Sequence, residues 1–140
     1  MDSPKNPSLR DARVARLATH NPSGAIDLVP ITFAFADDDT IVTAVDHKPK
    51  RTSKLQRLEN VRNDPRVTVL IDHYDDDWAA LWWVRLRGHA HVVDEPTSGQ
   101  LEPLIQKYEQ YQQTPPQGAL IVVSVEETNG WSAEGDYLPT

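Results

Sequence analysis

Cysteine is absent from the 140-residue sequence, which excludes disulfide bonds, thiolate metal ligands and a cysteine nucleophile. Long apolar runs are absent too, since none approaches the ~20 residues that a helix needs to span a bilayer. The first residues, MDSPKNPSLRDAR, lack the apolar core of a secretory signal. These absences predict a cytoplasmic protein with no membrane partner.

Positive charge is scarce except in one place. Over the whole chain 14 Lys and Arg stand against 21 Asp and Glu, for a net charge of −7. Residues 47–66, HKPKRTSKLQRLENVRNDPR, hold seven of the basic residues and two of the acidic ones, so the remainder has 7 against 19, or −12. Such a cluster is either a solvated helix face or the site of a small anionic partner. Nucleic acid is a poor candidate, because the remaining chain would repel a long polyanion.

The length of the chain predicts a single domain over residues 1–140. Short runs rich in β-branched residues recur between Gly, Pro, Asn and Asp, a pattern typical of a mainly β, antiparallel fold. In the run WWVRLRGHAHVV apolar and basic residues alternate, which predicts one face in the core and the other in water. Six strands are expected, at residues 13–20, 25–35, 40–46, 66–74, 82–93 and 119–126.

Two or three helices are expected beside the strands. The first lies in the basic segment, where Ser53 and Gln56 form an S-x-x-Q capping box and the triplet Asn-Asp-Pro at 63–65 ends the helix. Its buried side is expected to hold Leu55, Leu58 and Val61. A later helix is expected to carry Pro96 in its first turn. The apolar stripe of that helix comprises Leu101, Leu104, Ile105, Tyr108 and Tyr111.

Basic residues gather around the start of the first expected helix, where the backbone dipole is positive and N–H groups lack helical partners. Lys48, Lys50 and Arg51 precede this helix, and Lys54 and Arg57 follow Lys50 at i+4 and i+7. A bound phosphate would satisfy both the N–H groups and these cations. Without an anion the same residues form only a solvated face.

The apolar run AIDLVPITFAF contains a second irregularity. Ile26 and Leu28 set one phase of alternation, and Ile31 sets the opposite phase. This change predicts a bulge or kink at Val29 and Pro30. Such a bend either frees backbone groups to face a ligand or forms only a corner of the sheet.

Several motifs in this order resemble the pyridoxine-5'-phosphate-oxidase-like split barrels. They are the Pro in the second strand, the segment HKPKRTSKLQRLENVRNDPRVTVLIDHY between the third and fourth strands, and the motif DDDWxxLWWVR. Within that superfamily the sequence is most similar to the F420-dependent (deazaflavin) oxidoreductases of actinobacteria, over residues 13 to 133. The resemblance implies a six-stranded antiparallel split β-barrel of the FMN-binding type, and a homodimer with its cofactor site at the interface.

The resemblance also implies roles for individual residues. It places the phosphate of coenzyme F420, or of flavin mononucleotide (FMN), on basic residues, and the ring system beside the backbone of the irregular second strand. Because the third strand, TIVTAVD, lacks the Arg of the flavin-using oxidases, coenzyme F420 is favoured. Asn60 is a weaker candidate, because it is expected on another side of the helix. The matching residues are Lys48, Lys50, Arg51, Lys54 and Arg57 for the phosphate, and Val29, Pro30 and Ile31 for the ring.

Aromatic and histidine side chains supply further candidates. Trp78 and Trp131 have the rings needed to stack against a flat cofactor, although each also suits ordinary packing. Trp83 alternates with core positions on its strand and is a candidate for the dimer contact. His89 and His91 share a strand face, but no third ligand follows at metal-binding spacing, so no metal site is expected.

The expected activity is hydride transfer between reduced deazaflavin and a small organic substrate, since the sequence shows no nucleophile, catalytic dyad or metal motif. His73 and Tyr74 are possible proton donors, and no catalytic residue is assigned. The alternatives are an FMN-dependent oxidoreductase of the same fold and a non-enzymatic cofactor-binding protein.

Overall fold

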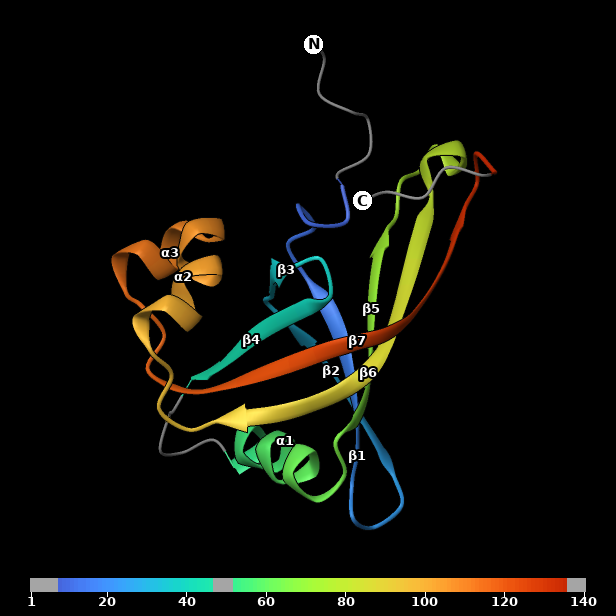
Figure 1. Cartoon of the computed structure of the whole chain (residues 1–140). Helices are drawn as coiled ribbons and strands as arrows, with labels where there is room; N and C mark the ends of the chain where they lie inside the picture. The colour runs from blue at the N-terminus through green and yellow to red at the C-terminus, as the bar shows by residue number, and fades with distance from the viewer. Residues whose placement is uncertain (1–7, 47–51, 136–140) are drawn as a thin grey trace.

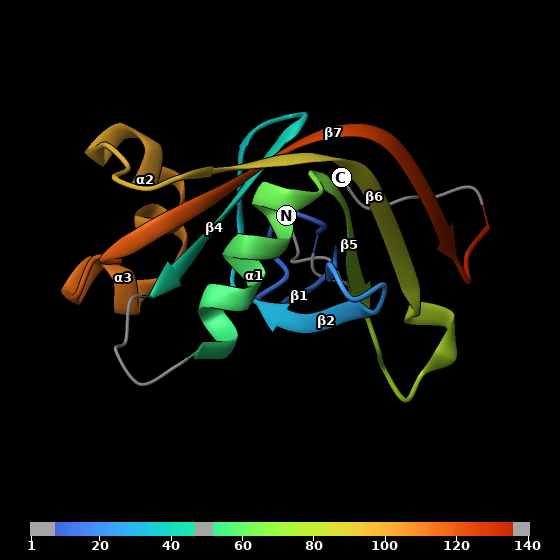
Figure 2. The same cartoon turned by 90° about the horizontal axis from the view of Figure 1, so that it is seen from below.

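The computed structural model describes residues 8–46 and 52–135. Its centre is one antiparallel sheet of seven strands in the order β2-β1-β5-β6-β7-β4-β3, strongly curled (Figures 1 and 2). The strands are β1 (Ala15–His20), β2 (Ile26–Ile31), β3 (Ala34–Asp37), β4 (Thr40–Asp46), β5 (Arg66–His73), β6 (Trp82–Val93) and β7 (Gly118–Ser132). The helices are α1 (Thr52–Asn63), the 3-10 helix η1 (Trp78–Ala80), α2 (Ser98–Lys107) and α3 (Glu109–Gln113).

The helices lie at separate parts of this sheet. Helix α1 lies across one end of it, as the view from below shows (Figure 2). The pair α2 and α3 lies beside β4, and η1 lies at the end of the sheet opposite α1 (Figure 1). Within the described ranges, every helix is too short or too polar to cross a bilayer.

The expectation of six strands is wrong, because the run 25–35 forms two strands rather than one. β2 pairs with β1, whereas β3 pairs with β4 at the opposite edge of the sheet. Phe33 lies at the crossing between them and is fully buried. Its N–H donates to the Tyr108 hydroxyl at 3.0 Å, and its carbonyl lies 3.1 Å from the same hydroxyl. A side chain distant in the sequence therefore replaces the strand neighbour that Phe33 lacks.

The expected bulge at Val29 and Pro30 is also wrong. The register between β1 and β2 runs without a shift from Ala15 opposite Ile31 to His20 opposite Ile26. The apolar pattern changes phase because two apolar side chains of β2, Ile26 and Leu28, point outward and are 56% and 66% exposed. Alternate residues therefore face inward along the whole of β2, and the chain bends only after Ile31.

The alternation expected in β6 is confirmed, and it forms the main core. Trp82, Val84 and Leu86 are buried, while Arg87 and His89 of the other face are exposed. The core also receives Leu58 and Val61 from α1, as expected. A smaller second core lies under α2 and α3 and contains Ala34, Val42, Leu104, Tyr108 and Leu120.

The last strand extends beyond its expected end at residue 126. β7 continues to Ser132 and pairs with β6 from Leu120 to Ser132, with one register shift between Arg87 and Gly88. A Cβ atom on Gly88 would lie 1.9 Å from the backbone oxygen of Ser124. Glycine is therefore required where β6 and β7 approach most closely.

The helix boundaries match the expectations in part. α1 ends at Asn63, before Asp64 and Pro65, as expected. Pro96 lies before its helix rather than in the first turn, because Thr97 is the N-cap and forms a capping box with Gln100. The later helix divides in two at Tyr108, whose extended backbone ends α2.

Candidate functional site

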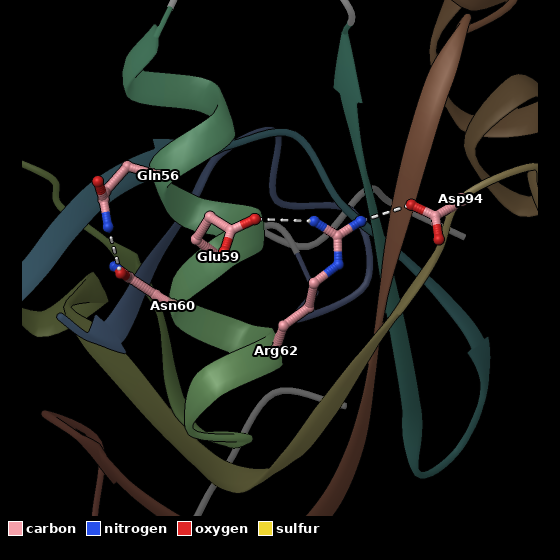
Figure 3. Close-up of polar contacts among 5 residues, drawn as sticks. All are labelled: Gln56, Glu59, Asn60, Arg62 and Asp94. Atoms are coloured by element: carbon pink, nitrogen blue, oxygen red, sulfur yellow. Dashed lines mark hydrogen bonds and ion pairs between the residues drawn. The ribbon is translucent and has the colours of Figure 1, made fainter. Parts of the chain in front are cut away.

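A buried polar network joins α1 to the first two strands. Asn60 is fully buried, and its Nδ2 donates to Thr19 Oγ1 at 3.0 Å and to Asp27 Oδ2 at 2.8 Å. Its Oδ1 accepts a hydrogen bond from Gln56 Nε2 at 2.9 Å, as Figure 3 shows. Asn60 was expected to be a weaker binding candidate, and the structure places it at the contact between α1, β1 and β2.

The carboxylate of Asp27 is the acceptor at the centre of this network. Besides Asn60, the Nδ2 of Asn21 donates to Asp27 Oδ2 at 3.0 Å. These hydrogen bonds, first from Asn21 and then from Asn60, lower the pKa of Asp27 below its usual value. Asp27 is therefore a fixed negative charge at neutral pH.

One cavity borders this network, and a second shares Arg57 with it. The larger, about 420 Å³, is lined in part by Asn21, Asp27, Leu28, Val29, Gln56 and Arg57. The smaller, about 160 Å³, is lined in part by Pro30, Ile31, Thr32, Thr43, Arg57 and Tyr111. Arg57 lines both cavities, and we refer to the two together as the α1 groove, lined by residues of α1, β2 and β4.

Two polar atoms in the α1 groove are buried and lack a partner among the described residues: Nε of Arg57 and Oγ1 of Thr43. Thr43 is 1% exposed. Burial lowers the pKa of the Arg57 guanidinium below its usual value, which still leaves this group charged at neutral pH. Buried donors without partners are rare in folded proteins, and a bound acceptor would satisfy both.

The structure brings together part of the expected site. Val29, Pro30, Ile31 and Arg57 all line the α1 groove. Trp78 does not, because it lies in η1 at the other end of the sheet, where it is 68% exposed and donates to the Tyr74 hydroxyl at 3.3 Å.

The remaining basic candidates are described only in part or not at all. Lys48, Lys50 and Arg51 lie outside the described residues. For Lys54 the structure gives the backbone, which belongs to the first turns of α1. The role of these four residues stays a prediction.

Sequence reasoning missed Thr43 and Asp27. A signal was present for Thr43, because it is a polar residue within the apolar strand TIVTAVD. In the structure Ile41 and Val45, which lie on the same face of β4 as Thr43, are buried together with it. For Asp27 there was no comparable signal, since Asp is common beside a turn.

A second pocket of about 380 Å³ lies at the opposite end of the sheet. It is lined in part by Leu70, Tyr74, Trp82, Trp83, Arg85 and Trp131, from three neighbouring strands and the chain after β5. We call it the aromatic pocket. His73 and Tyr74, the possible proton donors, line this pocket and not the α1 groove.

No cluster of potential metal ligands occurs in the part of the chain that the structure describes. His89 has a carboxylate neighbour instead, since its Nδ1 lies 2.7 Å from Glu126 Oε2.

Comparisons with known proteins agree with the fold. Among solved structures, a conserved hypothetical protein from Mycobacterium tuberculosis is similar with a TM-score of 0.69 and 24% identity, over 92% of this chain and 82% of the other. An F420 reductase is similar with a TM-score of 0.65 and 22% identity, over 91% and 98%. An FAD-binding protein from Mesorhizobium loti has a TM-score of 0.63 and 18% identity, over 88% of each chain.

The sequence itself supplies the assignment. No curated protein is significantly similar to this chain. The family model of pyridoxamine 5'-phosphate oxidase, however, matches residues 6–132, which is nearly the whole chain. The chain therefore belongs to the pyridoxamine 5'-phosphate oxidase family.

Proposed function

We propose that the protein is an oxidoreductase that binds a flavin-type cofactor in the α1 groove. Coenzyme F420 is the favoured cofactor and FMN the alternative, and the reaction is hydride transfer between reduced deazaflavin and a small organic substrate. The observation that carries the proposal is the pair of buried, unpartnered polar atoms on Arg57 and Thr43. Both residues line a cavity that Pro30 and Ile31 also line.

The residues of the α1 groove fit such a cofactor. Arg57 and Thr43 suit anionic or carbonyl oxygens, because a guanidinium and a hydroxyl both donate hydrogen bonds. β2 is an edge strand, so alternate N–H and C=O groups of its backbone have no strand partner. These groups suit the polar edge of a fused ring system that lies beside Val29, Pro30 and Ile31.

When bound, reduced deazaflavin supplies the hydride. The chain has to bind it, orient it and keep the phosphate in one place. Asp27 contributes to this, since its fixed negative charge disfavours an anion at the end of the groove near Asn21. The phosphate is thereby directed toward Arg57 and the start of α1.

The basic residues near α1 extend this cationic region. Lys48, Lys50 and Arg51 directly precede α1 in the sequence, and Lys54 lies in its first turns. We propose that they bind the phosphate and the polyglutamate tail of coenzyme F420. The rest of the chain is acidic, so attraction is restricted to this region.

We also propose that the protein is a homodimer whose partner subunit completes the cofactor site. Ile26 and Leu28 support this, because they are exposed apolar residues on the strand that borders the α1 groove. Light scattering at micromolar concentration tests it, and a monomer would contradict it.

Titration of the purified protein with coenzyme F420 and with FMN tests the proposed function. Arg57→Met and Thr43→Val each remove one unpartnered group, and Arg57→Met should weaken cofactor binding by about 10- to 100-fold. Arg62→Met is the matched control, since Arg62 is on the same helix but pairs with Glu59 and Asp94 outside the groove. Tighter binding of FMN would reverse the choice of cofactor, and parent-like affinity in Arg57→Met would contradict the site.

The double variant Lys50→Ala/Lys54→Ala tests the basic segment separately. It should weaken binding of coenzyme F420 by about tenfold or more, and salt should weaken binding in the parent more than in the variant. A solvated charged face would leave the affinity unchanged.

A further inference from the structure

A lysine side chain lies against two aromatic rings where α2 ends. Lys107 is the last residue of α2 and is half-buried. Its Nζ donates to the Phe33 carbonyl oxygen at 2.9 Å. The same nitrogen lies 3.6 Å from the centre of the Phe33 ring and 5.3 Å from the centre of the Tyr108 ring. One carbonyl and two ring faces thus replace part of the water that an ammonium group otherwise binds.

The charges around this amine favour its neutral form. In the described part of the chain no carboxylate lies within 4 Å of the Lys107 amine. The nearby cation is Arg13, which lies over the Tyr108 ring at 4.6 Å and donates to the Lys107 backbone carbonyl at 3.3 Å. Burial, and then the charge of Arg13, lower the pKa of Lys107 to about 8, against the opposing charge of Asp11.

Small molecules can reach this amine through a cavity of about 560 Å³. We call it the α2 pocket, and its described lining residues include none of those that line the α1 groove or the aromatic pocket. It lies between α2, β3 and the chain that leads into β1. The side chains at its wall include those of Arg10, Asp11, Phe35, Glu102, Gln106 and Lys107.

The other charged groups of the α2 pocket already have partners. Arg10 pairs with Asp38 at 2.7 Å, and Asp11 accepts a hydrogen bond from the Ser8 hydroxyl at 2.9 Å. Glu102 accepts one from the side chain of Gln106 at 3.1 Å. With cations and carboxylates both present, the pocket has little net attraction for a multiply charged reagent and suits an uncharged one.

We propose that Lys107 is an acylation site that reacts with thioesters of small carboxylic acids. The neutral amine attacks the thioester carbonyl carbon, a C–N bond forms and the C–S bond breaks. The proton that the amine loses goes to the departing thiolate, so the products are an amide and a free thiol. A lysine that is desolvated beside another cation is a good nucleophile at neutral pH, and lysine is the usual target of acylation.

The fold accommodates the product. An acylated Lys107 keeps one N–H, which is the donor that the Phe33 carbonyl needs. The loss of the positive charge also removes the repulsion between Lys107 and Arg13. What is lost is the contact of a cation with the Phe33 ring.

The test incubates the full-length protein, without cofactor, with the uncharged thioester S-acetyl-N-acetylcysteamine. Peptide mass spectrometry follows acetylation of Lys107, and Nα-acetyllysine amide is the reference compound. At pH 7.5 roughly a quarter of the Lys107 amines are neutral, against about 0.1% for an ordinary lysine of pKa 10.5. A less basic amine is intrinsically a weaker nucleophile, so we expect a rate several-fold above the reference. The rate at Lys107 should level off above about pH 8, while that of the reference continues to rise.

Two variants of exposed residues should change the rate in opposite directions. Arg13→Gln removes a repelling cation, which raises the pKa of Lys107 and should slow acetylation at pH 7.5 by about two- to threefold. Asp11→Asn removes an attracting carboxylate and should accelerate it by a similar factor. Arg16→Gln is the control, because Arg16 pairs with Asp72 and does not line the α2 pocket. Asp11→Asn keeps the test decisive if Arg13→Gln does not fold.

Acetyl phosphate, an anionic acyl donor, tests the class of reagent. Its rate at Lys107 relative to the reference compound should exceed unity by less than that of the thioester, and a larger ratio would overturn the choice of thioesters. A Lys107 rate at or below the reference, or one that rises without a plateau to pH 10, would overturn the site. So would the absence of acetylation, including the case in which a second copy covers the pocket. Because no cofactor is used, these outcomes leave the proposed function untouched.

Discussion

Helices α1 and η1 lie at opposite ends of the sheet (Figure 1). The α1 groove near the first and the aromatic pocket near the second share one property. Among the described residues, every buried side-chain nitrogen or oxygen without a partner belongs to a residue that lines one or the other. Thr43 and Arg57 line the first, and His73, Trp82 and Arg85 line the second. Unpaired buried polar groups are costly, and here they are confined to residues of these two regions.

The two sites differ in how their surroundings are held. At the α1 groove, Asn60, Thr19, Asp27 and Gln56 bind one another, so the cavity wall is fixed by hydrogen bonds. At the aromatic pocket the walls are exposed rings on strand ends. The first region is thus held by directional hydrogen bonds, and the second presents aromatic surface.

β6 connects the two ends of the sheet, and Gly88→Ala should disrupt its pairing with β7. The added Cβ would meet the Ser124 carbonyl oxygen at 1.9 Å, so β6 and β7 would have to separate. We expect a loss of roughly 3 kcal/mol or more in the free energy of unfolding, measured by urea denaturation. Gly99→Ala is the control, because its nearest neighbour would be 3.9 Å away. Equal stability of both variants would contradict the close approach.

Asn60→Ala should damage the α1 groove alone. Removing this buried amide takes the donor from Thr19 Oγ1 and leaves Asp27 with only the Asn21 donor, at a cost of about 2–3 kcal/mol in unfolding free energy. Asn63→Ala, at the exposed end of the same helix, should change stability by less than about 0.5 kcal/mol. Equal stability of the Asn60→Ala variant and the parent would contradict the hydrogen bonds of this network.

Acid should weaken the α1 groove through Asp27. Because the folded protein lowers the pKa of this carboxyl, its contribution to stability is complete above the ordinary Asp pKa, near 4, and is lost as the pH falls through the lower folded value. Asp27→Asn removes this dependence, so the stability difference between parent and variant should shrink as the pH falls below about 4. Urea denaturation at several pH values measures it, and a constant difference would contradict the assigned hydrogen bonds.

The smallest effect is expected from the ion pair that ties α1 to the end of β6. Arg62 lies between Glu59 and Asp94, 2.5 Å from the Asp94 carboxylate, and all three side chains are exposed (Figure 3). Asp94→Asn should cost no more than about 0.5 kcal/mol, and less at high salt. A larger loss that shrinks at high salt would show that charge, and not only Leu58 and Val61, holds α1 in place.

Local patterns were sufficient to predict most of the fold. The alternation in the run WWVRLRGHAHVV predicted both faces of β6, and the triplet at 63–65 predicted the end of α1. The division of β2 from β3 was not predictable in this way, because it depends on Tyr108, 75 residues away from Phe33. Exposed Ile26 and Leu28 misled the phase assignment in β2, since apolar residues on an edge strand look like core residues in a sequence.

The candidate site was predicted in part for the same reason. Arg57, Val29, Pro30 and Ile31 were identified from charge and from an unusual Pro, and they line one groove. Trp78 was selected only because it is aromatic, and the fold places it at the far end of the sheet. The contact of Asn60 with Thr19 and Asp27 depends on how α1 meets the strands, which no local pattern encodes.

The hydroxyl of Tyr108 has a consequence for shortening this protein. It accepts the Phe33 N–H at 3.0 Å and lies 2.9 Å from the Arg13 carbonyl, so it contacts both the segment before β1 and the crossing between the edge strands β2 and β3. The segment that contains α2 and α3 connects β6 to β7, and its position beside the sheet suggests that a short linker could replace it. Such a deletion would remove the hydrogen bonds that join Tyr108 to Phe33 and Arg13. A shortened version of this protein therefore has to retain Tyr108 in its extended conformation.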